Sequence, residues 1–459
     1  MKTTDAISGT GRGRRLLDRI GLDRPELRAW ALYDWAKSAF ETTIGAAVFP
    51  AYWGTVAAAT LAPNVATSYL GFTHSIALLI IALAAPVLGA VADFMGAKKR
   101  FLAVFMGVGV IATGGLFLVQ RGDWLLAAIL FIIGTIGVTG STIFSDSLLP
   151  HIAADEEIDR VSTAGYALGY FGGGVLLAIN VVMIASPGAI GLPDASMAVR
   201  VVFLTVAAWW LLFALPLLRG VPEPTRRIEH VERVDQRPVR AGFARLRETF
   251  GEIRQYRELF KFLLAYWLYI DGIHTIQKMA VVYGTELALP RSTLIGAILL
   301  VQFVGIPATF AFGAIAGRIG ARNGLYIALA VYTAIATFGY FVREAWHFWM
   351  LAIFVGLVQG GAQALSRSLY AGMVPRAKSS EFFSFFSIFE KFGGIVGPAL
   401  FGAVALLTGT SRLGILALVA FFVGGIALLT TVDIAAGRAA ARREDASLHV
   451  VGIEPGSRP

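Results

Sequence analysis

The chain has 459 residues, of which 56% are hydrophobic and 15% are charged, and its net charge is +9 at pH 7. Soluble domains carry about 25% charged residues, so this composition excludes an ordinary water-soluble protein and makes lipid the solvent for most of the surface. Because the chain has no cysteine and its six histidines show no metal-ligand spacing, we expect no disulfide, no metal site and no cofactor.

Twelve hydrophobic stretches are long enough to cross a bilayer, which requires about 20 apolar residues. The first 29 residues are polar and arginine-rich and lack the apolar core of a cleaved signal peptide, so the first membrane helix is expected to direct insertion. The predicted membrane helices are 30–56, 68–92, 101–120, 124–149, 161–185, 200–219, 259–284, 292–316, 324–342, 346–373, 382–408 and 412–433.

The longest polar stretch inside the chain, 220–258, separates six predicted helices from six others. The sequence therefore predicts an all-α membrane protein of two pseudo-symmetric six-helix bundles. The expected parts are an N-terminal tail (1–29), a first bundle (30–219), a linker (220–258), a second bundle (259–433) and a disordered C-terminal tail (434–459).

The basic residues predict the orientation. With the N-terminus in the cytoplasm, 30 of the 39 lysines and arginines fall in cytoplasmic segments and five fall outside. By the positive-inside rule, we expect both termini to lie in the cytoplasm. We expect the protein to lie in the inner membrane of the cell. Since the positive charges flank hydrophobic spans, they do not indicate a nucleic-acid partner, and we expect a monomer.

The two halves repeat each other. Asp34, Lys37 and Glu41 in the first helix are spaced by three and four residues, and Asp271, His274 and Lys278 in the seventh have the same spacing. Residues so spaced share one helix face. The loop GAVADFMGAKK (89–99) is likewise matched by GAIAGRIGAR (313–322). Two parallel six-helix repeats are the plan of a large class of transporters.

Nine charged residues lie inside predicted helices. An ion at the centre of a membrane helix costs roughly 2.5–3.5 kcal/mol, so these groups must be paired or hydrated, as structural ion pairs or as a transport site. They are Asp34, Lys37, Glu41, Asp146, Asp271, Lys278, Arg367, Glu390 and Lys391.

The charges suggest roles in binding a solute and an ion. We expect the acidic groups Asp34, Glu41 and Asp271 to carry protons or cations. The basic groups expected to bind a carboxylate or phosphate are Lys37, Lys278, Arg367 and Lys391. His274 could relay protons or simply pack, and Gln359 and Gln363 could bind the solute or join helices. Glu390 and Lys391 are adjacent in sequence, so their side chains point about 100° apart on a helix. We expect Lys391 to be the one that faces a central cavity.

The loop GAVADFMGAKKR resembles the signature loop of the major facilitator superfamily at Gly89, Asp93, Gly96 and Lys98. There Asp93 can meet the N-terminal dipole of a neighbouring helix and hold one side of the transporter shut. The resemblance implies that the first, fourth, seventh and tenth helices line a central cavity, and these helices hold seven of the nine charges. We also expect Asp146 and Arg367, which occupy equivalent places in the two halves, to form a gating ion pair.

The segments RAWALYDWAKSAFETTIGAAVFPAYW and GGAQALSRSLYAGMVP, with the GY-x-GGG stretch, resemble the vacuole-effluxer-like family of that superfamily, in its bacterial-type form. The family is typified by a fungal vacuolar amino-acid exporter. The resemblance implies a twelve-helix transporter and favours amino-acid efflux.

The leading hypothesis is therefore a secondary transporter that works by alternating access, is driven by protons or another coupling ion, and exports a small polar or zwitterionic solute such as an amino acid. A lipid or amphipathic-drug exporter, with Trp267 and Phe389 lining its path, is the alternative. A non-transporting receptor or an enzyme is a distant third hypothesis, because the sequence shows no nucleophile–base pair and no nucleotide-binding loop.

Overall fold

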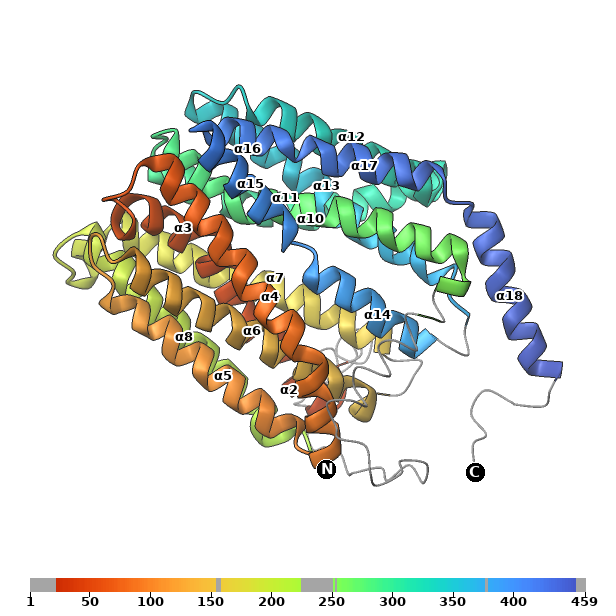
Figure 1. The fold of residues 1–459 in the computed structure, drawn as a ribbon. Helices are drawn as coiled ribbons and strands as arrows, with labels where there is room; N and C mark the ends of the chain where they lie inside the picture. Colours follow the sequence, from red (N-terminus) through yellow and green to blue (C-terminus); the bar gives the residue numbers. More distant parts are fainter. Residues whose placement is uncertain (1–21, 154–157, 224–250, 252–253, 376–378, 451–459) are drawn as a thin grey trace, which may run out of the picture. The chain divides into compact units, whose positions relative to one another are not determined.

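The structure is a computed structural model that describes residues 22–153, 158–223, 251, 254–375 and 379–450. Every regular element in these residues is helical, which confirms the predicted all-α class (Figure 1). The elements of the first part are α2 (Pro25–Ala39), η1 (Phe40–Ala47), α3 (Val48–Tyr52), η2 (Trp53–Ala57), α4 (Pro63–Met95), α5 (Lys98–Gly115), η3 (Leu116–Leu118), α6 (Trp124–Ile152), α7 (Ile158–Ala185), η4 (Pro187–Ile190) and α8 (Ala195–Gly220). The later elements are α10 (Arg257–Glu286), α11 (Arg291–Ile319), α12 (Ala321–Gly339), α13 (Ala345–Ala371), α14 (Ser379–Phe392), α15 (Val396–Thr408), α16 (Ser411–Ala417), α17 (Val419–Thr430) and α18 (Ile434–Val450).

Seven helical spans in the described residues are long and apolar enough to cross a membrane. They are Pro63–Ala85, Lys98–Leu118, Trp124–Leu149, Ala164–Ala185, Ala195–Gly220, Ala345–Ala371 and Ser411–Thr430. The protein is therefore a multi-pass membrane protein. The other five predicted spans do not meet this criterion in the described residues, and the count of twelve stays a prediction.

The chain divides into two compact units. Unit 1 comprises Met1–Phe49, Val87–Val119 and Leu125–Pro238, and unit 2 comprises Pro50–Pro86, Gln120–Trp124 and Val239–Pro459. The long helix α4 thus contributes residues to both. Most of the predicted linker, 224–250 and 252–253, and residues 1–21 of the predicted N-terminal tail lie outside the described residues.

The first predicted helix, 30–56, is not a uniform α-helix. The α-helix α2 changes at Phe40 into the π-helical segment η1, which is followed by one short α-helical stretch and a second π-helical segment, η2. π-helical turns are rare in proteins, and those that occur are often found at functional sites. The hydrophobic pattern that predicts a helix here does not distinguish an α-helix from a π-helix.

The predicted helix 382–408 is broken. The helix α14 ends at Phe392 and α15 begins at Val396, and Figure 1 shows the two as separate ribbons. Gly394 lies between them with φ +106°, a left-handed conformation that favours glycine. The glycines and proline at 393–398 predict a kinked stretch, and the structure confirms it.

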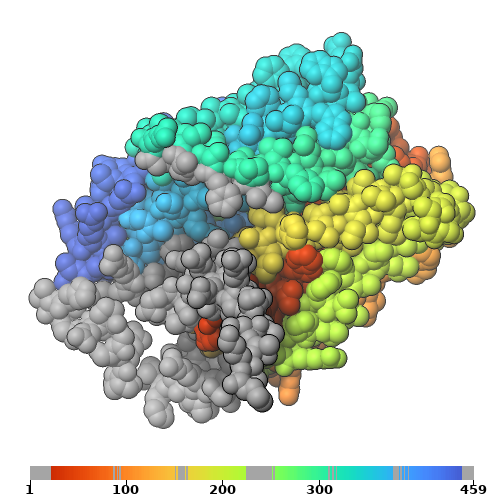
Figure 2. All heavy atoms as spheres, turned by 180° about the vertical axis from the view of Figure 1, so that it is seen from behind, coloured from red at the N-terminus to blue at the C-terminus, as the bar shows by residue number. Residues whose placement is uncertain are grey.

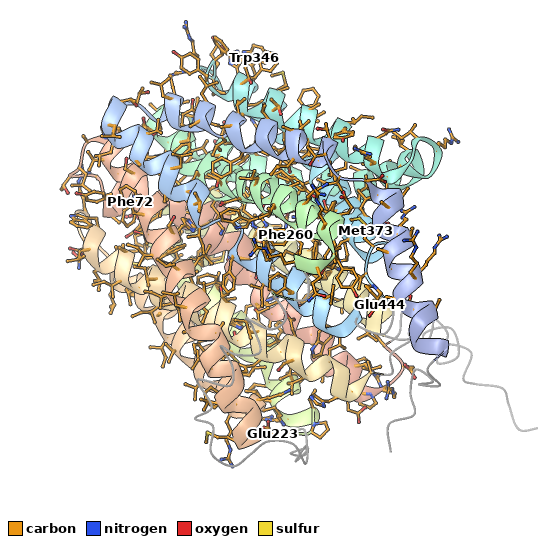
Figure 3. All side chains as sticks on the ribbon, turned by 45° about the vertical axis from the view of Figure 1, so that its right-hand side comes forward. Phe72, Glu223, Phe260, Trp346, Met373 and Glu444 are labelled. Atoms are coloured by element: carbon orange, nitrogen blue, oxygen red, sulfur yellow. The ribbon has the colours of Figure 1, made fainter. Side chains whose placement is uncertain are left out.

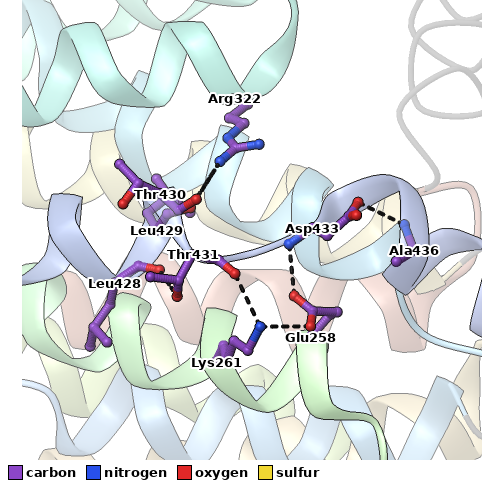
Figure 4. Close-up of polar contacts among 9 residues, drawn as sticks. All are labelled: Glu258, Lys261, Arg322, Leu428, Leu429, Thr430, Thr431, Asp433 and Ala436. Carbon is purple, nitrogen blue, oxygen red and sulfur yellow. Dashed lines mark hydrogen bonds and ion pairs between the residues drawn. The ribbon is translucent and has the colours of Figure 1, made fainter.

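The expectation of a disordered tail after residue 433 is wrong for 434–450, which form α18. Its start is attached to the beginning of α10 (Figure 4): the Asp433 N–H donates to Glu258 Oε2 at 2.7 Å, and Lys261 Nζ donates to Glu258 Oε1 at 2.7 Å and to the Thr431 carbonyl at 3.0 Å. Gly437 of α18 lies so close to Met373 that a Cβ would be 2.8 Å from its sulfur. These contacts give the polar segment a packed site.

Glu258 precedes the predicted membrane range, and its protonation should loosen α18. Partial burial raises the pKa of the Glu258 carboxyl, but the hydrogen bonds from Lys261 and from the Asp433 N–H outweigh burial, so this pKa lies below its usual 4.5. Because the folded-state pKa is depressed, the stabilisation is fully present above pH 4.5 and is lost as the pH falls through the folded-state pKa.

We therefore expect Glu258→Gln to speed amide hydrogen exchange in α18 several-fold at neutral pH. The matched control is Glu344→Gln, which removes the carboxylate that caps the start of α13. Exchange in α18 that is unchanged by Glu258→Gln would show that the carboxylate does not hold the helix.

The surface of unit 2 is apolar over α11 to α13, which form a continuous region in the space-filling view (Figure 2, green to cyan). A groove at the start of α13 is lined by Phe338, Phe341, Val342, Trp346, His347, Met350 and Leu351. Figure 3 shows Trp346 at the end of unit 2 opposite Met373. Exposed aromatic residues at one end of a membrane helix are typical of the interface between lipid and water.

Candidate functional site

Unit 1 contains a cluster of three charged side chains on one helix face. Lys37 Nζ lies 3.3 Å from Asp34 Oδ1 and 3.4 Å from Glu41 Oε1. The side chains of Asp34 and Lys37 are 14% and 11% exposed, whereas Glu41, at the start of η1, is 50% exposed. The cluster holds two carboxylates and one ammonium, so with all three ionised it carries one net negative charge.

A glycine face on α7 packs against this cluster. A Cβ at Gly165 would lie 2.6 Å from Asp34 Oδ2, and one at Gly169 would lie 2.7 Å from Ser38 Oγ. A Cβ at Gly173 would lie 2.8 Å from the Ser38 carbonyl. The small-residue pattern at these three positions thus allows α7 to lie directly against α2.

Asp146 lies on α6, which also packs against α2. The Trp30 indole N–H donates to the Ser145 carbonyl at 2.8 Å, so the residue next to Asp146 is fixed to the helix that carries Asp34. Asp146 itself is exposed. The predicted ion pair between Asp146 and Arg367 would join the two units and stays a prediction.

The signature loop between α4 and α5 contains a glycine in the left-handed conformation. Gly96 adopts φ +58°, and a Cβ at Gly89 would meet no atom within 4 Å. Lys98 Nζ lies 3.1 Å from His151 Nε2. The side chain of Asp93 lies outside the described residues, so its predicted role stays a prediction.

Glu223 interacts with the start of α5 and was missed by the sequence analysis. Its carboxylate accepts the Lys99 backbone N–H at 3.0 and 3.2 Å, in the way expected of an acidic group at a helix N-terminus. The only sequence signal was an acidic residue between two prolines (222 and 224) after a membrane helix.

Unit 2 contains a second cluster, formed by α10 at the break between α14 and α15. Asp271 is 1% exposed, and its oxygens accept the backbone N–H groups of Val396 at 3.1 Å and Gly397 at 2.9 Å. The His274 Nδ1–H donates to the Gly393 carbonyl at 2.8 Å. Lys278 Nζ lies at Gly394, where a Cβ would be 2.9 Å away. The three residues that share a spacing with 34, 37 and 41 therefore meet at one break in a neighbouring helix.

Arg367 of α13 forms an ion pair with Glu390 of α14, with 3.6 Å between Nη2 and Oε2. The side chain of Lys391, which we expected to face the cavity, lies outside the described residues. Gln359 and Gln363 are half-buried on α13, and the amide oxygen of Gln359 has no hydrogen-bond partner among the described residues.

Side chains of α4 complete the polar contacts of unit 2, and sequence reasoning missed them. Ser75 Oγ donates to the Ile395 carbonyl at 2.6 Å, and Thr67 Oγ1 donates to Glu286 Oε2 at 2.6 Å. Glu286 also accepts the backbone N–H of Ser411 at 3.1 Å, at the start of α16. A signal was available in the small and polar residues of α4 at helical spacing, namely Thr67, Gly71 and Ser75.

The comparisons with known proteins agree with a transporter fold. Residues 56–442 match the family model described as vacuole effluxer Atg22 like. The chain is 36% identical over 406 residues to the uncharacterized MFS-type transporter YxiO of Bacillus subtilis (strain 168), with 88% of this chain and 94% of that protein covered. It is 24% identical over 408 residues to autophagy-related protein 22 of Kluyveromyces lactis, with 82% of each covered.

Solved structures share the fold at low sequence identity. The nucleoside transporter NupG aligns with a TM-score of 0.60 at 14% identity, covering 91% of this chain and 98% of that chain. A bacterial homolog of the human lysosomal transporter Spinster, in an inward-facing and occupied conformation, also gives 0.60 at 14% identity, covering 92% and 97%. With a family match over most of the sequence and transporters as relatives, the chain belongs to the vacuole effluxer Atg22-like family of major facilitator transporters.

Proposed function

We propose that the protein is a proton-coupled secondary transporter that exports a small zwitterionic solute, with amino acids as the substrate class. The observation that carries the proposal is a pair of charged clusters, each with a buried charged residue, namely Lys37 in Asp34–Lys37–Glu41 of unit 1 and Asp271 in Asp271–His274–Lys278 of unit 2. Buried charges in a membrane protein are costly and mark substrate or ion pathways.

The geometry suggests a division of roles between the clusters. Lys37 already contacts two carboxylates, so the net negative charge of its cluster suits the ammonium group of a zwitterion or a proton. In unit 2, the Asp271 carboxylate, which accepts two backbone N–H groups, is the proposed proton acceptor, and Lys278 is the basic group proposed to bind a carboxylate. Efflux is supported by the description of the family as vacuole effluxers. We place the protein in the cell's inner membrane as a monomer, with two six-helix bundles and both termini in the cytoplasm.

The apolar groove at the start of α13 supports a lipid or amphipathic-drug exporter as the second candidate function. It is lined mainly by aromatic and aliphatic side chains. Neither of the two charged clusters contributes to its lining, however. Transport of a polar solute therefore gives the two charged clusters a function, whereas transport of a lipid through this groove would not.

The test is transport by purified protein in liposomes that enclose a pH-sensitive dye. Each of the twenty amino acids is added singly, and proton movement is followed with the dye. We expect a subset to move protons in wild-type protein. Asp271→Asn should abolish proton-driven transport while retaining exchange of solute for solute, because exchange needs no net proton movement.

The matched control is Asp194→Asn, which removes the carboxylate that accepts the Met197 N–H at the start of α8, outside both clusters. It should transport like wild type. Solute transport that persists unchanged when a protonophore abolishes the gradient would overturn proton coupling. Transport of lipids or amphipathic drugs, with no amino acid moved, would favour the second candidate.

A further inference from the structure

The break between α14 and α15 is short and buried, and its polar backbone groups need partners. Only residues 393–395 separate the two helices. The first N–H groups of any α-helix lack acceptors within the helix, and in a membrane protein they cannot turn to bulk water. The start of α15 therefore depends on side chains from neighbouring helices.

Three side chains from two helices supply those partners. Asp271 accepts the N–H groups of Val396 and Gly397, and His274 donates to the Gly393 carbonyl, both from α10. Ser75 of α4 donates to the Ile395 carbonyl. Four hydrogen bonds thus hold four of the five residues 393–397, and we name this set of contacts the α15 clamp.

The backbone of α15 lies so close to both neighbouring helices that side chains are excluded. A Cβ at Gly397 would lie 1.9 Å from Thr275 Oγ1 of α10, and a Cβ at Gly71 of α4 would lie 2.5 Å from the Pro398 carbonyl. A Cβ at Gly402 would lie 2.8 Å from the carbonyl oxygen of Ser68, also on α4. Since backbones touch directly here, loss of the clamp would move α15 relative to α4 and α10.

The charged and titratable groups around the break come from four helices besides α15. Lys278 and His274 stand on α10 itself, and His74 stands on α4, with a 2% exposed side chain. The Arg367–Glu390 ion pair comes from α13 and α14. The Lys278 ammonium and the N–H groups at the start of α15 surround the Asp271 carboxylate, and only the ionised carboxylate offers an acceptor oxygen to both N–H groups.

We propose that Asp271 is a positioning residue that holds α15 while ionised and releases it when it binds a proton. An ionised carboxylate accepts both N–H groups. Protonation converts one of its oxygens into a donor, so at most one of the two N–H groups keeps a good acceptor. The inference rests on the proposed function, because it identifies the step at which proton binding moves a helix of the transporter.

Amide hydrogen exchange of purified wild-type protein tests this without a substrate. Exchange rates of the peptide covering 393–400 are measured from pH 5 to pH 9 and corrected for intrinsic rates. We expect about ten-fold or greater loss of protection on acidification, in keeping with a lost hydrogen bond to a charged acceptor. Asp271→Asn should show the low protection at every pH, because an amide cannot be ionised.

Two further variants keep the test independent of misfolding. Ser75→Ala removes only the bond to Ile395, so it should lower protection of the same peptide while keeping the pH dependence. Asp194→Asn should affect only the start of α8. Protection of 393–400 that does not depend on pH in the wild-type protein, or a pH dependence that survives in Asp271→Asn, would overturn the clamp. Failure of amino-acid transport with a pH-dependent clamp would overturn only the proposed substrate.

Discussion

Replacing Lys37 with methionine should destabilise the protein by about 3 kcal/mol, as expected when one partner of a buried ion pair is removed. Methionine keeps the length of the side chain but leaves Asp34, which is 14% exposed, and Glu41 without their shared cation. The measurement is the thermal unfolding midpoint of purified protein in detergent, which should fall by several degrees.

The double variant Asp34→Asn/Lys37→Met decides between a structural and a functional cluster. Removing both charges of the closer pair should restore most of the lost stability, because no uncompensated charge remains deeply buried. If Lys37 only neutralises Asp34, the double variant should transport. If the cluster binds the solute or the proton, the double variant should be stable and inactive, which is the outcome we expect.

A less deeply buried pair of the same spacing provides the control. Lys261 and Glu258 are three residues apart on α10, with 2.7 Å between Nζ and Oε1, and they lie at the end of the helix. Lys261→Met should cost less than Lys37→Met, because the side chains of this pair are 26% and 19% exposed and keep more of their hydration. If Asp34→Asn/Lys37→Met is no more stable than Lys37→Met, the two charges are not energetically linked.

The all-helical class and most helix positions could be predicted from the sequence, because lipid requires long apolar stretches and the polar breaks between them are obvious. The shared faces at 34, 37 and 41 and at 271, 274 and 278 could be predicted for a similar reason, since helical spacing is a local property. The ion pairs within the first cluster follow directly from that spacing.

What could not be predicted depends on contacts between segments far apart in sequence. Nothing local to Asp271 shows that its partners are the N–H groups of Val396 and Gly397, 125 and 126 residues later. The helical spacing of Thr67, Gly71 and Ser75 places Ser75 on a face of small and polar residues, but it does not show that its partner is the Ile395 carbonyl. The glycines at 393–398 predict a kink, but only tertiary packing shows which side chains hold it.

The C-terminal tail illustrates a different limit. Its composition, rich in alanine and arginine, offers no hydrophobic stripe, and it was therefore expected to be disordered. The helix α18 forms because Glu258 and Lys261 bind its start and because Gly437 allows close contact with Met373. Small residues can pack a helix without a strong apolar pattern, and a hydrophobicity argument overlooks them.

Two neighbouring glycines on α7 allow a sharp test of the contact that supports the first cluster. A Cβ at Gly173 would lie 2.5 Å from Thr42 Oγ1 and 2.8 Å from the Ser38 backbone carbonyl, whereas a Cβ at Gly174 would meet no atom within 4 Å. We expect Gly173→Ala to destabilise the protein by about 1–3 kcal/mol, because the backbone carbonyl cannot turn aside. Gly174→Ala should be neutral or stabilising by up to about 1 kcal/mol, since alanine favours the helix.

The two variants add the same methyl group one residue apart, so a difference in their unfolding midpoints reports the packing of α7 on α2 and nothing else. Equal midpoints would show that α7 does not lie against Ser38 and Thr42. Because Gly165 on the same face touches Asp34, a displaced α7 also removes the wall behind the charged cluster. Gly173→Ala should therefore reduce transport by more than its loss of folded protein explains, and transport per folded molecule, compared with Gly174→Ala, measures that excess.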